Sequence, residues 1–134
     1  MTRWTTMCLL ALTVCLSGCK PGAEKLTGTV TYRERMALPA GAVIKIAVED
    51  VSRADSPAKV IGSTEIKPAG RQVPIPFEFS LMDPKAIEAG HRYTLRARIE
   101  SADGTLMFIN DTSYPVITNG VTHADMVLKR VAAN

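Results

Sequence analysis

Residues 72–80 have the sequence Gln-Val-Pro-Ile-Pro-Phe-Glu-Phe-Ser, which is the most regular alternation in the chain. Hydrophobic side chains occupy every second position, at Val73, Ile75, Phe77 and Phe79. In an extended chain these side chains share one face, and proline, glutamate and serine occupy the other. This period of two predicts a β-strand with one buried face.

Pro74 and Pro76 add a constraint to this strand. Residues two apart point their N–H groups to the same side, so the two prolines remove two donors from one edge. A strand in the middle of a sheet needs those donors. We therefore expect residues 72–80 to form an edge strand whose proline side has no neighbour. Such an edge resists the addition of a foreign strand, which predicts that a partner strand binds elsewhere.

Short alternating segments separated by turn residues continue on both sides of this strand. The predicted strands are residues 26–33, 44–49, 60–66, 72–80, 93–100, 106–109 and 121–131. Between a helix start at Asp83-Pro84 and a stop at Gly90 there is room for only about two helical turns. About seven strands with one short helical segment predict an all-β fold, namely an antiparallel β-sandwich. A small β-barrel is the alternative.

The beginning of the chain has a different pattern. A single arginine precedes residues 7–16, which are almost entirely apolar. That length is typical of a secretory signal peptide and too short for a membrane-spanning helix, which needs roughly 20 apolar residues. Residues 16–19, Leu-Ser-Gly-Cys, resemble a bacterial lipobox. The pattern predicts signal peptidase cleavage between Gly18 and Cys19, and lipid attachment at Cys19.

Lipidation of Cys19 would determine both anchor and location. Its sulfur would carry a covalent diacylglycerol and its amine an N-acyl chain, and two or more acyl chains give stable anchoring. Lys20, in place of an aspartate, favours the outer membrane and its periplasmic face. We therefore predict a signal peptide at residues 1–18, a lipidated tether at 19–25 and a β-sandwich domain at 26–134. The tether spans at most ~20 Å, which keeps the domain close to the bilayer.

Composition argues against most catalytic chemistry. Cys8 and Cys15 would leave with the signal peptide and Cys19 would be blocked by lipid, which removes thiol catalysis and Cys-based metal sites. His91 and His123 are the only histidines, and they lack the spacing of a metal site. The formal net charge of +3 gives no indication of nucleic-acid binding. We predict no catalytic residue, no metal, no other cofactor and no small-molecule substrate.

Two charged groups allow a functional interpretation, and both have a simpler structural one. Glu49, Asp50 and Asp55 lack the regular oxygen-ligand spacing of a calcium loop, so we expect a solvated strand end and loop. Arg96 and Arg98 share one face of a predicted strand and could contact lipid phosphate or an acidic partner. A solvated face with cross-strand carboxylates is the favoured interpretation.

Seven short segments form an ordered set along the chain. They are Thr31–Arg35, Leu38–Ala42, Glu49–Ser52, Val73–Phe77, Ala97–Ile99, Asp103-Gly104 and Tyr114–Val116. These segments and their order along the chain resemble those of the YbaY/YscW lipoprotein family, over roughly residues 26–121. The family offers no catalytic residues to carry over, and core packing and turns explain the matched positions.

The resemblance implies a β-sandwich lipoprotein of the outer membrane with no known catalytic activity. One branch of the family acts as a pilotin in type III secretion, which binds a secretin subunit and brings it to the outer membrane. We therefore hypothesise a non-enzymatic binding and assembly module that contacts the membrane through its lipid. Its partner would be a secretin or another envelope protein, bound at a face that the sequence does not specify. The alternatives are a structural or stress-related envelope lipoprotein without a dedicated client, and a small hydrolase or metal enzyme.

Overall fold

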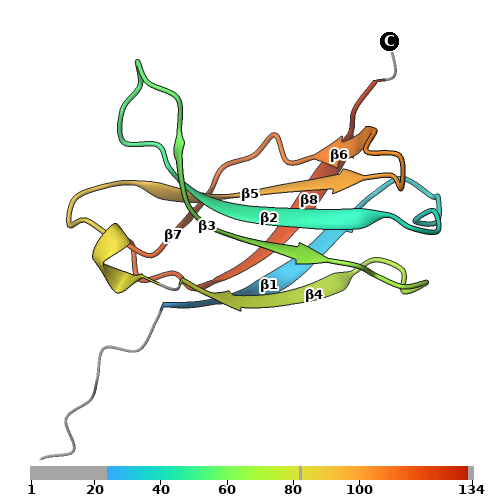
Figure 1. Ribbon diagram of the computed structural model, residues 1–134, viewed down its shortest axis with the longest axis horizontal. Helices are drawn as coiled ribbons and strands as arrows, with labels where there is room; N and C mark the ends of the chain where they lie inside the picture. The colour runs from blue at the N-terminus through green and yellow to red at the C-terminus, as the bar shows by residue number, and fades with distance from the viewer. Residues whose placement is uncertain (1–23, 82, 133–134) are drawn as a thin grey trace, which may run out of the picture.

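The computed structural model describes residues 24–81 and 83–132. These residues form eight β-strands and one 3-10 helix (Figure 1). The elements are β1 (Lys25–Tyr32), β2 (Val43–Asp50), β3 (Lys59–Ile66), β4 (Ile75–Ser80), η1 (Pro84–Ala86), β5 (Tyr93–Glu100), β6 (Leu106–Ile109), β7 (Tyr114–Val116) and β8 (His123–Arg130). The all-β prediction is confirmed. The predicted signal peptide and cleavage site lie outside the described residues.

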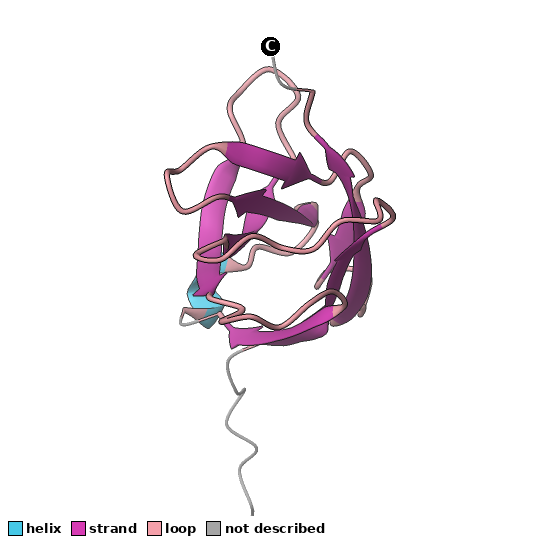
Figure 2. Ribbon diagram, turned by 90° about the vertical axis from the view of Figure 1, so that its right-hand side faces the viewer, coloured by secondary structure: helices cyan, strands magenta, loops and turns pink. Residues whose placement is uncertain are grey.

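The strands are paired in the order β3-β2-β5-β6-β8-β1-β4, with β7 beside β5. Every pair is antiparallel except β1 and β8, which run parallel. Because the β6/β8 ladder contains only two residue pairs, the order divides there into two layers. Figure 2 shows these layers facing each other and curling almost into a closed barrel. The arrangement confirms the predicted sandwich and shares the curvature of the barrel alternative.

The core lies between the two layers and follows from the alternation along each strand. In β1, every second residue from Leu26 to Tyr32 is buried. The Tyr32 ring stacks on Phe108 of β6, with centroids 4.2 Å apart and planes 10° from parallel. The Tyr32 hydroxyl donates to the carbonyl of Met36 at 2.8 Å, so the polar end of this buried side chain has a partner. Aromatic packing therefore joins β1 of one layer to β6 of the other.

Gly28 allows β1 and β8 to lie side by side. It pairs with Ala124, and a Cβ atom built at Gly28 would lie 1.8 Å from the Ala124 carbonyl oxygen. The same atom would lie 2.9 Å from a ring carbon of Phe77 in β4. The φ angle of Gly28, +157°, is also one that side-chain-bearing residues rarely adopt. Only glycine fits this position without moving backbone.

β4 is an edge strand, as the prolines predicted, since it has β1 as its one paired neighbour at the end of the strand order. The Leu81 N–H donates to the Glu24 carbonyl on the β1 side at 3.0 Å. Residues at even positions of β4 therefore direct their N–H positions to the free edge, and Pro76 costs the ladder no hydrogen bond. The strand is shorter than predicted: it begins at Ile75, so Pro74 lies just before it.

The sequence did not predict β7. Its three residues pair with the start of β5, and the buried Asn110 supports the turn before it. The Asn110 side chain accepts from the Ala97 N–H at 2.8 Å and donates to the carbonyls of Leu95 and Thr112. The predicted short helical segment after Asp83 is present as a single 3-10 turn, Pro84–Ala86.

Replacing Gly28 by alanine should destabilise the domain by about 3 kcal/mol or more, because the new methyl group meets backbone that cannot rotate away. The matched control is Gly62→Ala, where the clash is with a side-chain methyl group of Leu81 and not with backbone. We expect the control to cost about 1 kcal/mol. Urea unfolding of both variants checks the difference, and equal losses would contradict this role for the β1/β8 contact.

Candidate functional site

β1 distinguishes two ends of the domain. At the near end, Lys25 begins β1 and pairs with Ser80, just before η1. At the far end, Val30 pairs with Ile75 and the chain continues into the β1–β2 loop. The near end is on the left in Figure 1 and the far end on the right. Eight extended residues separate the two ends by roughly 25 Å.

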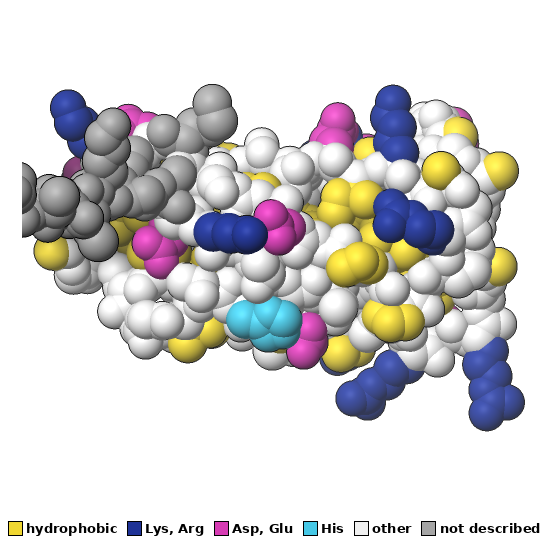
Figure 3. All heavy atoms as spheres, turned by 90° about the horizontal axis from the view of Figure 1, so that it is seen from below, with side chains coloured by type: hydrophobic (Ala, Val, Ile, Leu, Met, Phe, Trp, Pro, Cys, Tyr) yellow, Lys and Arg dark blue, Asp and Glu magenta, His cyan; other side chains and the backbone are white. Residues whose placement is uncertain are grey.

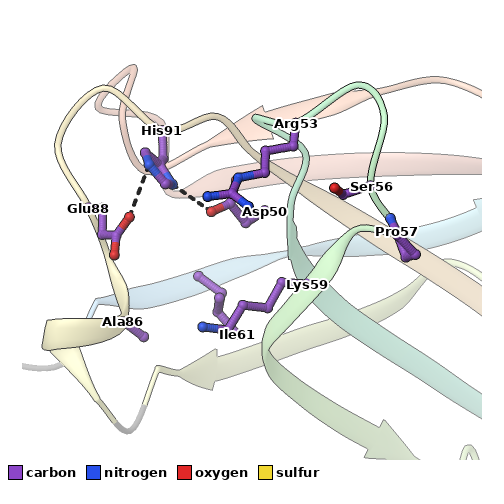
Figure 4. Close-up of a pocket in the computed structure, with 9 residues that line it drawn as sticks. All are labelled: Asp50, Arg53, Ser56, Pro57, Lys59, Ile61, Ala86, Glu88 and His91. Atoms are coloured by element: carbon purple, nitrogen blue, oxygen red, sulfur yellow. Dashed lines mark hydrogen bonds and ion pairs between the residues drawn. The ribbon is translucent and has the colours of Figure 1, made fainter.

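A pocket of about 320 Å³ lies at the near end, between the β2–β3 loop and the segment after η1 (Figure 4). His91 stands at its rim between two carboxylates. Its Nδ1 lies 2.7 Å from Asp50 Oδ2, and its Nε2 lies 2.9 Å from Glu88 Oε2. Arg53 and Lys59 contribute positive charge to the same pocket, so its lining carries both signs.

Asp50 is the centre of a hydrogen-bond network at this end. Its Oδ1 accepts from the hydroxyl and the N–H of Ser52, at 2.6 and 2.9 Å. The Ser52 hydroxyl in turn accepts from the Arg92 N–H at 2.8 Å. The Ser52 hydroxyl, followed by His91, holds the pKa of Asp50 down at about 2, below its usual 3.8. The network fastens the β2–β3 loop to the start of β5.

This geometry suits a structural connection better than catalysis. The Nδ1 atom of His91 is hydrogen-bonded to Asp50, and its Nε2 atom lies within ion-pair distance of Glu88. Both ring nitrogens therefore face carboxylates that connect neighbouring loops. Within residues 24–81 and 83–132, no group of three or more His, Cys, Asp or Glu side chains is arranged to hold a metal ion.

The outer face of β2, β3 and β5 carries paired charges. Arg96 lies 3.0 Å from Glu49 on the neighbouring strand. Arg98 and Lys45 both contact Glu100, at 3.1 and 2.8 Å. Because the basic side chains of these pairs remain partly exposed to solvent, each pair contributes little stability. The favoured interpretation, a solvated face with carboxylate partners, is confirmed, and Glu49 and Asp50 bind different partners rather than one cation.

A groove of about 420 Å³ lies at the far end, between three turns. The β1–β2 loop supplies Leu38 and Ala42, and the β5–β6 turn supplies Ala102. The β3–β4 loop supplies Lys67 and Arg71. We call this feature the far-end groove. Its lining is largely apolar, and its two charged residues are both basic.

Hydrogen bonds and close packing fix the walls of the far-end groove. The Leu38 N–H donates to the side chain of Gln72 at 2.7 Å, which ties the β1–β2 loop to the β3–β4 loop. The Arg71 N–H closes a turn on the Pro68 carbonyl at 3.1 Å. Within this turn Ala69 has a φ of 52°, a left-handed conformation that costs a non-glycine residue roughly 1–2 kcal/mol.

Sequence reasoning did not find either of these sites. Gly18 and Cys19, the predicted cleavage and lipid-attachment residues, lie outside the described residues. The Asp50–His91 contact joins positions 41 residues apart, and no local spacing announces it. Lys67 and Arg71 flank the turn residues Pro68-Ala69-Gly70, and a basic residue on each side of this turn was the available clue.

Comparison with known proteins assigns the chain to a family. Residues 21–128 match the family described as type III secretion system lipoprotein chaperone (YscW). The chain belongs to this family. The predicted family resemblance is therefore confirmed, and the family is one of lipoprotein chaperones.

Two relatives agree with this assignment. The uncharacterised lipoprotein YbaY of Escherichia coli K-12 is 39% identical over 103 residues, which are 77% of this chain and 53% of YbaY. The chain thus matches about half the length of this curated relative. An alternative pilotin from the type II secretion system of Vibrio cholerae is 45% identical, and its structure superposes with a TM-score of 0.78. The match covers 84% of this chain and all of that one.

The near-end network makes stability depend on pH through Asp50. A folded pKa of about 2 means that Asp50 stabilises the fold above its unfolded pKa, near 4. That contribution is lost as the pH falls from about 4 to 2. Asp50→Asn should therefore be less stable than wild type at pH 7, and the difference should shrink below pH 4.

Denaturant unfolding of both proteins between pH 7 and pH 2 measures this difference. The matched control is Asp55→Asn, since Asp55 is exposed in the same loop. A pH-independent difference between wild type and Asp50→Asn would contradict the assigned role of the Asp50 carboxylate.

Proposed function

We propose that this protein is a membrane-anchored, pilotin-like binding module that carries an envelope client, a secretin subunit, to the outer membrane. The observation that carries the proposal is the likeness to the Vibrio cholerae pilotin. Identity of 45% with complete coverage of that chain goes well beyond a shared fold. The family description, a lipoprotein chaperone of type III secretion, supports the same role.

The proposed mechanism is concentration at a surface. Lipid chains on Cys19 would hold the protein in the membrane, and the short tether would keep the β-domain within ~20 Å of it. A client bound to the domain is then confined to the same thin layer, which raises its effective concentration there. The domain needs only a binding face for this task, and no covalent step is involved.

The near and far ends would have different places in this arrangement. β1 begins at the near end, directly after the tether, so the near end lies toward the membrane. The far end then points into the periplasm, roughly 25 Å further out. A client that approaches from the periplasm meets the far end first.

Two substitutions beside the cleavage site test the proposal in cells. Cys19→Ala removes the acylated residue, so the protein and its client should both be lost from the outer-membrane fraction. Lys20→Asp retains the lipid and should hold the protein in the inner membrane, so the client should follow it there. Crosslinked pull-downs and membrane fractionation measure both positions.

Each outcome distinguishes the proposal from its alternative. Client capture that tracks the location of the lipoprotein supports the pilotin-like role. If wild-type protein captures no stoichiometric client, or the client stays in place when both variants move, the pilotin-like role is refuted. A structural envelope lipoprotein without a dedicated client would then be the better account.

A further inference from the structure

The far-end groove differs in charge from the other hollows of the domain. The near-end pocket combines Arg53 and Lys59 with Asp50 and Glu88. A hollow over β2, β3 and β5 and another beside β8 likewise contain both basic and acidic side chains. Of these four hollows in the described part of the chain, the far-end groove alone has basic residues without acidic ones. Its charge is therefore not neutralised by its own lining.

The two basic side chains of the groove are available to a ligand. Lys67 and Arg71 are both exposed, and neither forms an ion pair with any described residue. The Arg71 Nε–H donates to the Pro68 carbonyl at 3.1 Å, which orients the guanidinium. Its two terminal NH2 groups have no hydrogen-bond partner among the described residues, and this pair of donors matches a carboxylate.

One acidic residue lies near the groove without lining it. Asp103 follows Ala102 in the β5–β6 turn. Its carboxylate accepts hydrogen bonds from the Ser101 hydroxyl and the Thr105 N–H, and these hold its pKa at about 2. Asp103 is therefore satisfied within its own turn and does not pair with Lys67 or Arg71.

The floor of the groove is apolar and already shaped. Leu38 and Ala42 are almost fully buried, and Pro68 is buried beside them. A Cβ atom at Gly41 would lie 2.8 Å from that of Ala102, so the β1–β2 loop and the β5–β6 turn are in tight contact. Rigid walls of this kind lower the entropy lost when a ligand binds. On the face seen in Figure 3, Lys and Arg side chains gather at the right-hand end beside hydrophobic ones.

We propose that the far-end groove binds an acidic, apolar segment of the client protein. Apolar side chains of the segment pack on the exposed lining residues Pro39 and Ala102, above the buried floor of the groove. Its carboxylates pair with Lys67 and Arg71. Charge complementarity at an exposed rim mainly sets the rate of association and the register of the bound segment. The inference rests on the proposed function, since it assigns a binding face to that client. The far end lies away from the start of β1, which favours a protein segment over an anionic lipid surface as the occupant.

Charge reversal at the groove tests the inference in the full-length lipoprotein in its own membranes. The test variant is Lys67→Glu with Arg71→Glu, and a milder form is Lys67→Gln with Arg71→Gln. The matched control, Arg53→Glu with Lys59→Glu, reverses the same number of charges at the near-end pocket. Thermal unfolding of each purified variant confirms that it is folded. A photocrosslinking residue at position 69, on the turn between the two basic residues, identifies what lies against the groove.

We expect charge reversal at the groove to reduce client capture at least tenfold, neutralisation to reduce it less, and the control to stay within twofold of wild type. Capture should weaken as salt is raised. The segment crosslinked at position 69 should contain more Asp and Glu than Lys and Arg. Undiminished capture by the groove variants, a net basic segment, or crosslinking to lipid would overturn the inference and leave the proposed function intact. Absence of client capture by wild-type protein would instead refute the proposed function.

Discussion

The contact between β1 and β8 at Gly28 is the constraint on which the rest of the structure depends. The first and last strands of the domain run in parallel, and the Ala124 carbonyl lies where any other residue would place its Cβ atom. Since β1 also pairs with β4, this contact holds one whole layer together. Within the sheet, that layer pairs with the other one only through the short β6/β8 ladder. The packed core and a hydrogen bond from the Val127 N–H of β8 to the Tyr114 hydroxyl of β7 also join the layers. The turns at both ends connect these strands, so their positions depend on how the two layers pack.

Charged side chains have different roles at the near and far ends of the domain. At the near end, His91 and Ser52 satisfy Asp50, and the resulting network fixes the loops to one another. At the far end, backbone hydrogen bonds, the Gln72 amide and the Asp103 carboxylate fix the turns. The charges of Lys67 and Arg71 remain unpaired among the described residues. Partner contacts are better made by groups that the fold itself does not use. We propose that this division places the anchor at one end and client binding at the other.

Much of the fold was predictable because hydrophobic and polar residues alternate along the strands, and this alternation shows directly which side chains are buried. The two prolines of residues 72–80 identified an edge strand, because a residue without an N–H cannot donate to a neighbouring strand on that side. The parallel pairing of β1 with β8 was not predictable, because it joins residues 96 positions apart in the chain. β7 was missed since three residues show no period, and its pairing is set by the satisfied amide of Asn110. The far-end groove is assembled from three separate turns, so no single motif marks it.

We propose that the domain carries a client to the membrane in which a lipid on Cys19 would anchor the protein. Density-gradient separation of inner and outer membranes, from cells with and without the lipoprotein, tests this most directly. The account predicts that the client sediments with the outer membrane only when the lipoprotein is present, and with the inner membrane or the soluble fraction otherwise. A client distribution that does not change when the lipoprotein is removed would contradict it.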